Sequence, residues 1–332
     1  MKNISVPIVF ILPLTMLMFF LAQQAFGQTI VDRIPLKPGP EDMVLDSLHG
    51  DPGLIISCCG RREADKPYGE MIHFDLLSGK QQVMERINEP EDILFRPHGI
   101  YLDGDKLYVI SHEKEPDFHP VLVYRVDGRK LDFIEMIHTT HQHSPNALVT
   151  GPGGEIYLVN DSGKRGSMME KALKLKRASV EKLTKNSDGE WVAEMVADKL
   201  GYPAGINRIG DQLYVGDAVL SKIHVYEISR EGLKPVGEIK KLKGNDNIRI
   251  YKGQLLTPGH VKPLKFIKYA KNPKKKSPVD VFLVDPDSNE HSVLYSTDGS
   301  TISGGSTAII FENKLYICQV FDPYILKVEL NP

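Results

Sequence analysis

The chain has 332 residues, of which 41% are hydrophobic, and its formal net charge is −2. A chain of this kind can bury a large core, and its charge excludes a global field that would attract nucleic acid or an anionic membrane. Only three cysteines are present, two of them adjacent, which excludes a disulfide framework as the main source of stability.

The first 27 residues are typical of a secretory signal peptide. Lys2 supplies a positive start, residues 6–22 form an apolar run, and Ala25 and Gly27 precede a cleavage point before Gln28. We therefore expect a mature chain of residues 28–332 that is secreted or periplasmic. The alternative is an uncleaved membrane anchor, for which the run is slightly short, and membrane contact is expected only in that case.

A hairpin pattern recurs along the rest of the chain. Its clearest copy is RPHGIYLDGDKLYVISH (residues 96–112), in which Asp-Gly separates two apolar runs. His98 and His112 flank the runs, and a hairpin would bring them to the same end. Six such units have a second strand of Leu-Tyr-Val type, and these strands recur every 40 to 60 residues or so, at 54–56, 107–109, 156–158, 213–215, 255–257 and 315–317.

Six units of this length predict an all-β fold, a six-bladed β-propeller forming one domain over residues 28–332. Further strand-like runs lie between the units, at 121–126, 222–228 and 264–269. Helical periodicity is nearly absent, and the best helix candidate is 167–175. We expect residues 324–330 to close the ring with a strand from the start of the mature chain. A β-sandwich is the alternative, but it would not require evenly recurring hairpins.

Polar residues stand just before the first strand of most units. The equivalent pairs are Glu41 and Asp42, His98 and Gly99, Asn146 and Ala147, Ala204 and Gly205, Asp246 and Asn247, and Ser306 and Thr307. The innermost strand of each blade lines the channel, so these positions should form one ring at one of its ends. Taken singly, each reads as a turn-capping residue. Taken together, their oxygens favour Ca²⁺, whereas zinc would need more imidazoles or thiolates.

Several segments, in this order, resemble the paraoxonase (arylesterase) family of propellers, which is related to senescence-marker and gluconolactonase proteins. They are GPEDMVL, RPHGIYL, SPNALVTGPGGEIYLVND, YPAGINRIGDQLYVG, DNIRI and GSTAIIFENKLYICQVF. The resemblance runs along nearly the whole expected mature chain. It implies hydrolysis of an ester or lactone, a calcium ion at the channel floor, and a short helix at 168–175 over the channel mouth.

The resemblance also implies which residues hold the ion. The matching ligands of this first calcium are Glu41, Asn146, Asp246 and Asn247. Ala204 stands where the family has a fifth ligand, an asparagine, so weaker binding is expected. A second, structural calcium would use Asp42 and the Ile100 carbonyl, but Ala147 replaces its other aspartate, which argues against this ion. The family's disulfide is missing, with Val328 in the place of one cysteine.

By the same resemblance, His98 and His112 match a histidine dyad and His260 matches a third histidine near the pocket. In the implied mechanism, calcium polarises the substrate carbonyl and His98 takes a proton from the attacking water. His112 orients His98 or relays the proton. Asp246 or Glu41 acting as base or nucleophile is the alternative.

Two other functional hypotheses stay open. The chain could be a non-catalytic binding propeller with a degraded metal site, for which Ala204 and Ala147 are the support. His138, His141 and His143 could hold a different metal near the channel mouth, although an exposed polar loop explains them more simply. The expected partner is a small-molecule ester or lactone and not a nucleic acid; the sequence does not choose between aryl ester, lactone and phosphotriester.

Overall fold

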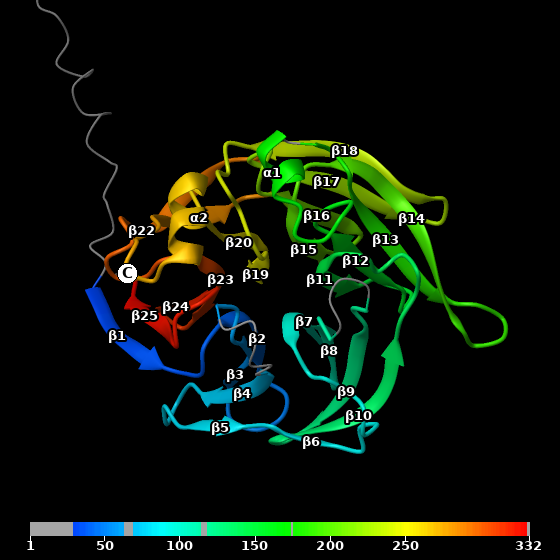
Figure 1. Cartoon of the computed structure of the whole chain (residues 1–332), viewed down its shortest axis with the longest axis horizontal. Helices are drawn as coiled ribbons and strands as arrows, with labels where there is room; N and C mark the ends of the chain where they lie inside the picture. The colour runs from blue at the N-terminus through cyan, green and yellow to red at the C-terminus, as the bar shows by residue number, and fades with distance from the viewer. Residues whose placement is uncertain (1–28, 63–68, 114–117, 174, 331–332) are drawn as a thin grey trace, which may run out of the picture.

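The computed structural model describes residues 29–330 apart from 63–68, 114–117 and 174, so the predicted signal peptide lies outside the described residues. The strands form six separate sheets arranged around a ring (Figure 1). This arrangement confirms the prediction of an all-β, six-bladed propeller. In the described part of the chain, no helix is long and apolar enough to cross a membrane.

The first three blades follow one another along the chain. Blade 1 contains β2 (Pro40–Asp46), β3 (Gly53–Cys59), β4 (Gly69–Asp75) and β5 (Gln81–Val83). Blade 2 contains β7 (Pro97–Asp103), β8 (Lys106–Ser111), β9 (Val121–Asp127) and β10 (Lys130–Ile137), with β6 (Glu85–Ile87) added in parallel to β10. Blade 3 contains β11 (Pro145–Thr150), β12 (Ile156–Asn160), β13 (Ala178–Lys185) and β14 (Trp191–Leu200).

The remaining blades complete the circle. Blade 4 contains β15 (Pro203–Ile209), β16 (Gln212–Asp217), β17 (Lys222–Ser229) and β18 (Gly232–Lys240). Blade 5 contains β19 (Arg249–Tyr251), β20 (Gln254–Gly259), β21 (Val279–Val284) and β22 (His291–Thr297). Blade 6 contains β23 (Gly305–Phe311), β24 (Lys314–Gln319), β25 (Tyr324–Glu329) and β1 (Thr29–Pro35).

Burial decreases from the axis outward. Every residue of β11 and β12 is buried, whereas β14 and β18 are mostly exposed or half-buried. Inner strands are covered on both faces by the neighbouring blades, which explains their nearly continuous apolar runs. The core therefore lies between blades: one cluster joins Val44 and Met71 of blade 1 to Ile100 and Val109 of blade 2.

The two ends of the described chain meet in blade 6. Strand β1 pairs antiparallel with β25, from Ile30 opposite Val328 to Pro35 opposite Tyr324. This pairing confirms the predicted closure, in which the last strand of the chain shares a blade with the first. The ring is thus closed by hydrogen bonds and packing, with no disulfide among the described residues.

One sequence expectation about secondary structure is wrong. Residues 264–269, expected as a strand, lie in helix α2 (Pro263–Lys271). Pro263 occupies the first turn, where its fixed φ favours a helix, and Lys268 and Lys271 lie in the last turn, where cations favour the helix dipole. The predicted helix at 167–175 is observed as α1 (Met168–Leu173).

Ile325 provides a test of the closure. It is fully buried and pairs with Ile34 across the β25–β1 interface. Replacing Ile325 with Ala should lower the free energy of unfolding by about 2–5 kcal/mol, since methylenes are removed from a packed site. Urea denaturation measures this, with Lys327→Ala on the same strand as control; equal losses in both variants would contradict closure by packing.

Candidate active site at one end of the channel

A β-bulge marks the start of most inner strands. Pairing with the next strand shifts register after Pro40, Pro97, Pro145, Pro203 and Gly305. The residues that follow these positions are the predicted ring residues, which are Glu41, His98, Asn146, Ala204 and Ser306. A bulge turns a side chain out of the regular alternation and often lies beside an active site. Proline before the ring residue, present in four blades, is a sequence signal that the hairpin pattern did not use.

Glycines allow the inner strands to approach closely at this level. A Cβ atom on Gly99 would lie 2.2 Å from the Asn146 carbonyl oxygen, and one on Gly205 would lie 2.4 Å from that of Asp246. Neither position tolerates a side chain without movement of the backbone. The close contact brings ring residues of neighbouring blades together.

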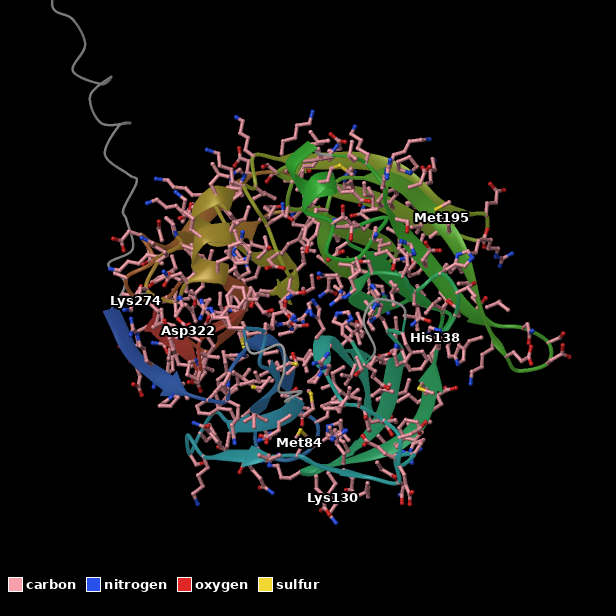
Figure 2. The ribbon with its side chains drawn as sticks, in the orientation of Figure 1. Met84, Lys130, His138, Met195, Lys274 and Asp322 are labelled. Atoms are coloured by element: carbon pink, nitrogen blue, oxygen red, sulfur yellow. The ribbon has the colours of Figure 1, made fainter. Side chains whose placement is uncertain are left out.

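The ring residues line one cavity of about 460 Å³. It is lined at its floor by Glu41, His98, Asn146, Ala204 and Asp246. The structure thus brings together side chains from five blades that are far apart in the sequence, and side chains from all around the ring project into its centre (Figure 2).

The two other predicted ring positions lie beside this cavity and not on its lining. Asn247 is buried and donates from Nδ2 to Oγ1 of Thr307 at 3.0 Å. Ser306 donates to the Glu41 carbonyl oxygen.

The walls of the cavity come from loops and were not predicted. They include Arg61, Asp161, Arg165, Tyr202, Phe266, Val320 and Phe321. Only Phe266 belongs to a helix, α2, and Arg165 immediately precedes the α1 region. These residues have no repeat phase in the sequence, so periodicity could not reveal them.

Asp161 fixes the orientation of Asn146. The Asn146 amide donates from Nδ2 to Oδ2 of Asp161 at 3.2 Å, and Ser162 donates to Oδ1 of Asp161 at 2.6 Å. Tyr202 also hydrogen-bonds Asp161; burial and this carboxylate hold the Tyr202 pKa well above its usual value. Held in this way by its NH₂ group, Asn146 has its amide oxygen available on the other side, toward the cavity.

The two predicted histidines form a buried pair that continues to a third. Ring centroids lie 4.7 Å apart for His98 and His112, and 5.0 Å apart for His112 and His119. The Nδ1 atoms of His112 and His119 are 3.3 Å apart. His119 was missed because it lies outside the hairpin whose ends His98 and His112 mark.

Burial keeps the histidine pair neutral. It is the largest cause that holds the pKa of both His98 and His112 well below the usual range; Arg61 adds to it at His98 and Arg165 at His112. Arg61 donates to Nδ1 of His98 at 2.7 Å. Since a guanidinium can only donate, His98 accepts at Nδ1 and carries its proton on Nε2 in this arrangement.

Glu41 is an acid of the floor with a raised pKa. Burial raises its pKa from 4.5 to about 7, Arg61 counteracts this, and Asp246 raises it further. Arg61 is in direct contact with Oε2 of Glu41, and Nδ1 of His98 lies 3.2 Å from the same oxygen. Nε2 of His260 lies 3.0 Å from Oδ2 of Asp246, within hydrogen-bonding distance, and the His260 ring stacks on the Phe266 ring.

The donor set fits a hard cation. Two carboxylates and an amide oxygen converge on the cavity from three blades. A cation would offset the burial of Glu41 and its repulsion by Asp246, which together raise the Glu41 pKa. Within residues 29–330 as described, no group of three or more His, Cys, Asp or Glu side chains could hold a metal. Any ion in this cavity would therefore need amide oxygens in addition to the carboxylates of Glu41 and Asp246.

The cluster of His138, His141 and His143 does not form a metal site. His138 packs against the Phe118 ring and lies away from the axis of the ring (Figure 2). His141 instead pairs with Glu181 at 3.0 Å, and Nδ1 of His143 contacts the His141 carbonyl oxygen.

Asp42 and the Ile100 carbonyl, expected around a second calcium, do come together, but they surround an arginine. Arg249 donates to Oδ1 of Asp42 at 2.6 Å and to the Ile100 oxygen at 3.1 Å. Burial raises the Asp42 pKa, and the Arg249 charge and the Ile100 N–H counteract this. The residues present do not fit a second metal ion.

The family model and the relatives that match this chain all have arylesterase, paraoxonase or lactonase in their names. A family model described as Arylesterase matches residues 63–329. Human serum paraoxonase/arylesterase 2 is 27% identical over 274 residues, covering 76% of this chain and 74% of that protein. Human serum paraoxonase/lactonase 3 is 25% identical over 276 residues, covering 77% of this chain and 75% of that protein.

Solved structures support the fold alone, because their sequence identity is low. A luciferin-regenerating enzyme matches with a TM-score of 0.57 at 10% identity, covering 91% of this chain and 95% of that one. The aldose sugar dehydrogenase of Streptomyces coelicolor, bound to PQQ, matches with a TM-score of 0.56 at 11% identity, covering 91% and 98%.

The raised pKa of Glu41 predicts a pH-dependent stability. Between pH 4.5 and about 7 the metal-free folded protein holds a proton on Glu41 that the unfolded chain has lost. The Glu41 contribution to stability should therefore fall as pH rises through this window, by up to roughly 3 kcal/mol. The lowered pKa values of His98 and His112 act in the opposite direction, so the quantity tested is the difference between the wild type and a Glu41 variant. Glu41→Gln cannot ionise and should remove this loss.

Urea unfolding in EDTA at pH 5 and pH 8 measures the effect. The exposed Glu190 supplies the control variant Glu190→Gln, which should keep the wild-type pH dependence. An unchanged pH dependence in Glu41→Gln would contradict the burial of this charge.

Proposed function

Because the chain belongs to the arylesterase family, we propose that it is a calcium-dependent hydrolase of carboxylic esters or lactones. The observation that carries the proposal is one cavity that combines oxygen donors from separate blades with the buried His98, whose ring packs against His112. The names of the relatives, paraoxonase/arylesterase and paraoxonase/lactonase, support the reaction class. We further propose that residues 1–27 are removed during export, leaving one propeller domain.

The floor would hold the ion through Glu41, Asn146 and Asp246. Asn247, which the resemblance gave as a fourth ligand, lies beside the cavity and holds Thr307. A bound calcium ion supplies a Lewis acid that polarises the substrate carbonyl and stabilises negative charge on its oxygen. Asp161 positions the Asn146 amide for this role, since it holds the NH₂ group. Ala204 leaves one place on the floor without a side-chain oxygen.

The histidines would handle the proton of the attacking water. His98 is neutral, as a general base must be, and its pair with His112 and His119 offers a buried route for the proton. Arg61 occupies Nδ1 of His98. His98 can therefore accept a proton there only after Arg61 withdraws, so Arg61 controls when the base is competent.

The walls would receive the substrate's organic group. Phe266, Val320 and Phe321 form an apolar side of the cavity, and the Phe266 and Phe321 rings lie 5.9 Å apart. An acyl chain or an aryl leaving group would bury apolar area against them. The neutral Tyr202 phenol lies on another wall as a hydrogen-bonding group.

A second function is favoured by one specific contact. Arg61 pairs directly with Glu41, so the floor has its own cation even without a metal. A propeller that only binds a small molecule would be consistent with this contact. Hydrolysis of phenyl acetate and of several lactones, with and without EDTA, separates the two functions, because a binding protein would hydrolyse neither.

His98 gives the sharpest catalytic prediction. His98→Gln should lower kcat for phenyl acetate or a lactone by about 10²–10⁴-fold, the usual contribution of a general base. The control is His143→Gln, which alters a half-buried histidine outside this cavity and should retain activity. Full activity in His98→Gln would remove this histidine from the mechanism.

Ala204 gives a prediction in the opposite direction. It lines the floor at the same bulge position as Glu41 and Asn146. Ala204→Asn should tighten calcium binding about tenfold or more, because affinity grows with the number of oxygen ligands. Isothermal titration measures the change; Ala204→Val, which fills the place without an oxygen, should not tighten binding, and equal affinities in both variants would contradict the site.

A further inference from the structure

Asp42 is a carboxylate buried one layer below the catalytic floor. It is 1% exposed, lies next to Glu41 on β2, and does not line the candidate active-site cavity of about 460 Å³. It accepts hydrogen bonds from the Met43 N–H, the Ile100 N–H and the Thr307 hydroxyl. A buried charge of this kind needs a cation nearby to be tolerated.

Arg249 is that cation, and its donors are directed at two strands, β2 and β7, and at the residue that precedes it in the chain. Nε donates to the Met43 carbonyl at 2.8 Å, and Nη1 donates to the Ile248 carbonyl at 3.1 Å. Nη2 donates to Asp42 at 2.6 Å and to the Ile100 carbonyl at 3.1 Å. The guanidinium therefore joins β19 to β2 and β7 in the middle of the ring. It also lines a small cavity of about 180 Å³ that lies further along the inner strands.

We propose that the Arg249 guanidinium is a built-in replacement for a second metal ion in this channel, so that the chain holds at most one divalent cation. The charges favour this assignment. One guanidinium balances the single negative charge of Asp42. A divalent ion held by the Asp42 carboxylate and the Ile100 carbonyl would instead leave one excess positive charge. Ala147, at the repeat position equivalent to Asp42, offers no second carboxylate.

The replacement has a consequence for the catalytic floor. The Thr307 hydroxyl contacts both Asp42 and the Glu41 carbonyl, at 2.7 and 3.0 Å, and Asn247 donates to the same hydroxyl oxygen. Arg249 thus acts as a positioning residue for Glu41 and Asn247 through Asp42 and Thr307. The floor is arranged by a covalently attached cation that chelators cannot remove.

Counting bound ions in the wild-type protein tests the proposal directly. Equilibrium dialysis against millimolar radioactive calcium should give no more than one ion per chain. Two ions per chain would overturn the proposal. A count of zero would remove calcium from the proposed function while leaving the replacement by Arg249 intact, so the two failures are distinguishable.

Variants test the role of the arginine itself. In EGTA, Arg249→Met should raise the unfolding equilibrium constant at least a hundredfold, because Asp42 is left buried without its counter-ion. The control Arg125→Met breaks an exposed pair with Asp105 and should change it less than about fivefold. Equal stability of the two variants would overturn the proposal.

A gain of function completes the test. Arg249→Ser combined with Ala147→Asp removes the guanidinium and supplies a second carboxylate in the same layer. This double variant should bind one calcium ion more than the wild type and should melt at a higher temperature when calcium is added. A count equal to that of the wild type contradicts the proposal, and the wild-type count decides the matter if the double variant does not fold.

Discussion

The structure depends on the cost of burying carboxylates together at the axis of a ring. Glu41 and Asp246 share one cavity, and Asp42 lies directly below them. Carboxylates in a low-dielectric interior lose hydration, which is the main reason that the Glu41 pKa is raised, and repulsion from Asp246 and Asp42 raises it further. Each layer therefore needs positive charge. Arg249 provides it for the lower layer, and Arg61 together with a bound cation would provide it for the upper layer.

The repeat of the fold brings these buried side chains together at the axis. Five blades each contribute one residue at or just before the start of the inner strand. In four of them a bulge at this position breaks the regular alternation of side chains. Small residues such as Gly99 let adjacent blades approach, so that groups separated by hundreds of residues become neighbours. The same apolar inner strands that stabilise the ring by packing between blades exclude water from the site, which strengthens every electrostatic interaction within it.

Sequence reasoning could predict the parts of the molecule that carry a period. The six hairpins, the closure by the last strand, and the positions of Glu41, His98, Asn146 and Asp246 around one channel all follow from repeat phase. Helix α2 was misassigned because its short alternation of apolar and basic residues also suits a strand. His119, Arg61 and Tyr202 lie in loops outside the repeat. Arg249 sits on β19, two residues beyond Asn247, and only its partners on β2 and β7 reveal its role.

The central claim is that one divalent ion binds at the upper layer of the channel and none at the lower. Anomalous scattering from crystals soaked with a calcium analogue such as Tb³⁺ tests this most directly. We expect a single strong peak among the oxygens of Glu41, Asn146 and Asp246, with the Arg249 guanidinium still in contact with Asp42. A peak beside Asp42 would contradict this description of the channel. So would the absence of a peak at the floor at an ion concentration at which calcium itself would occupy that site.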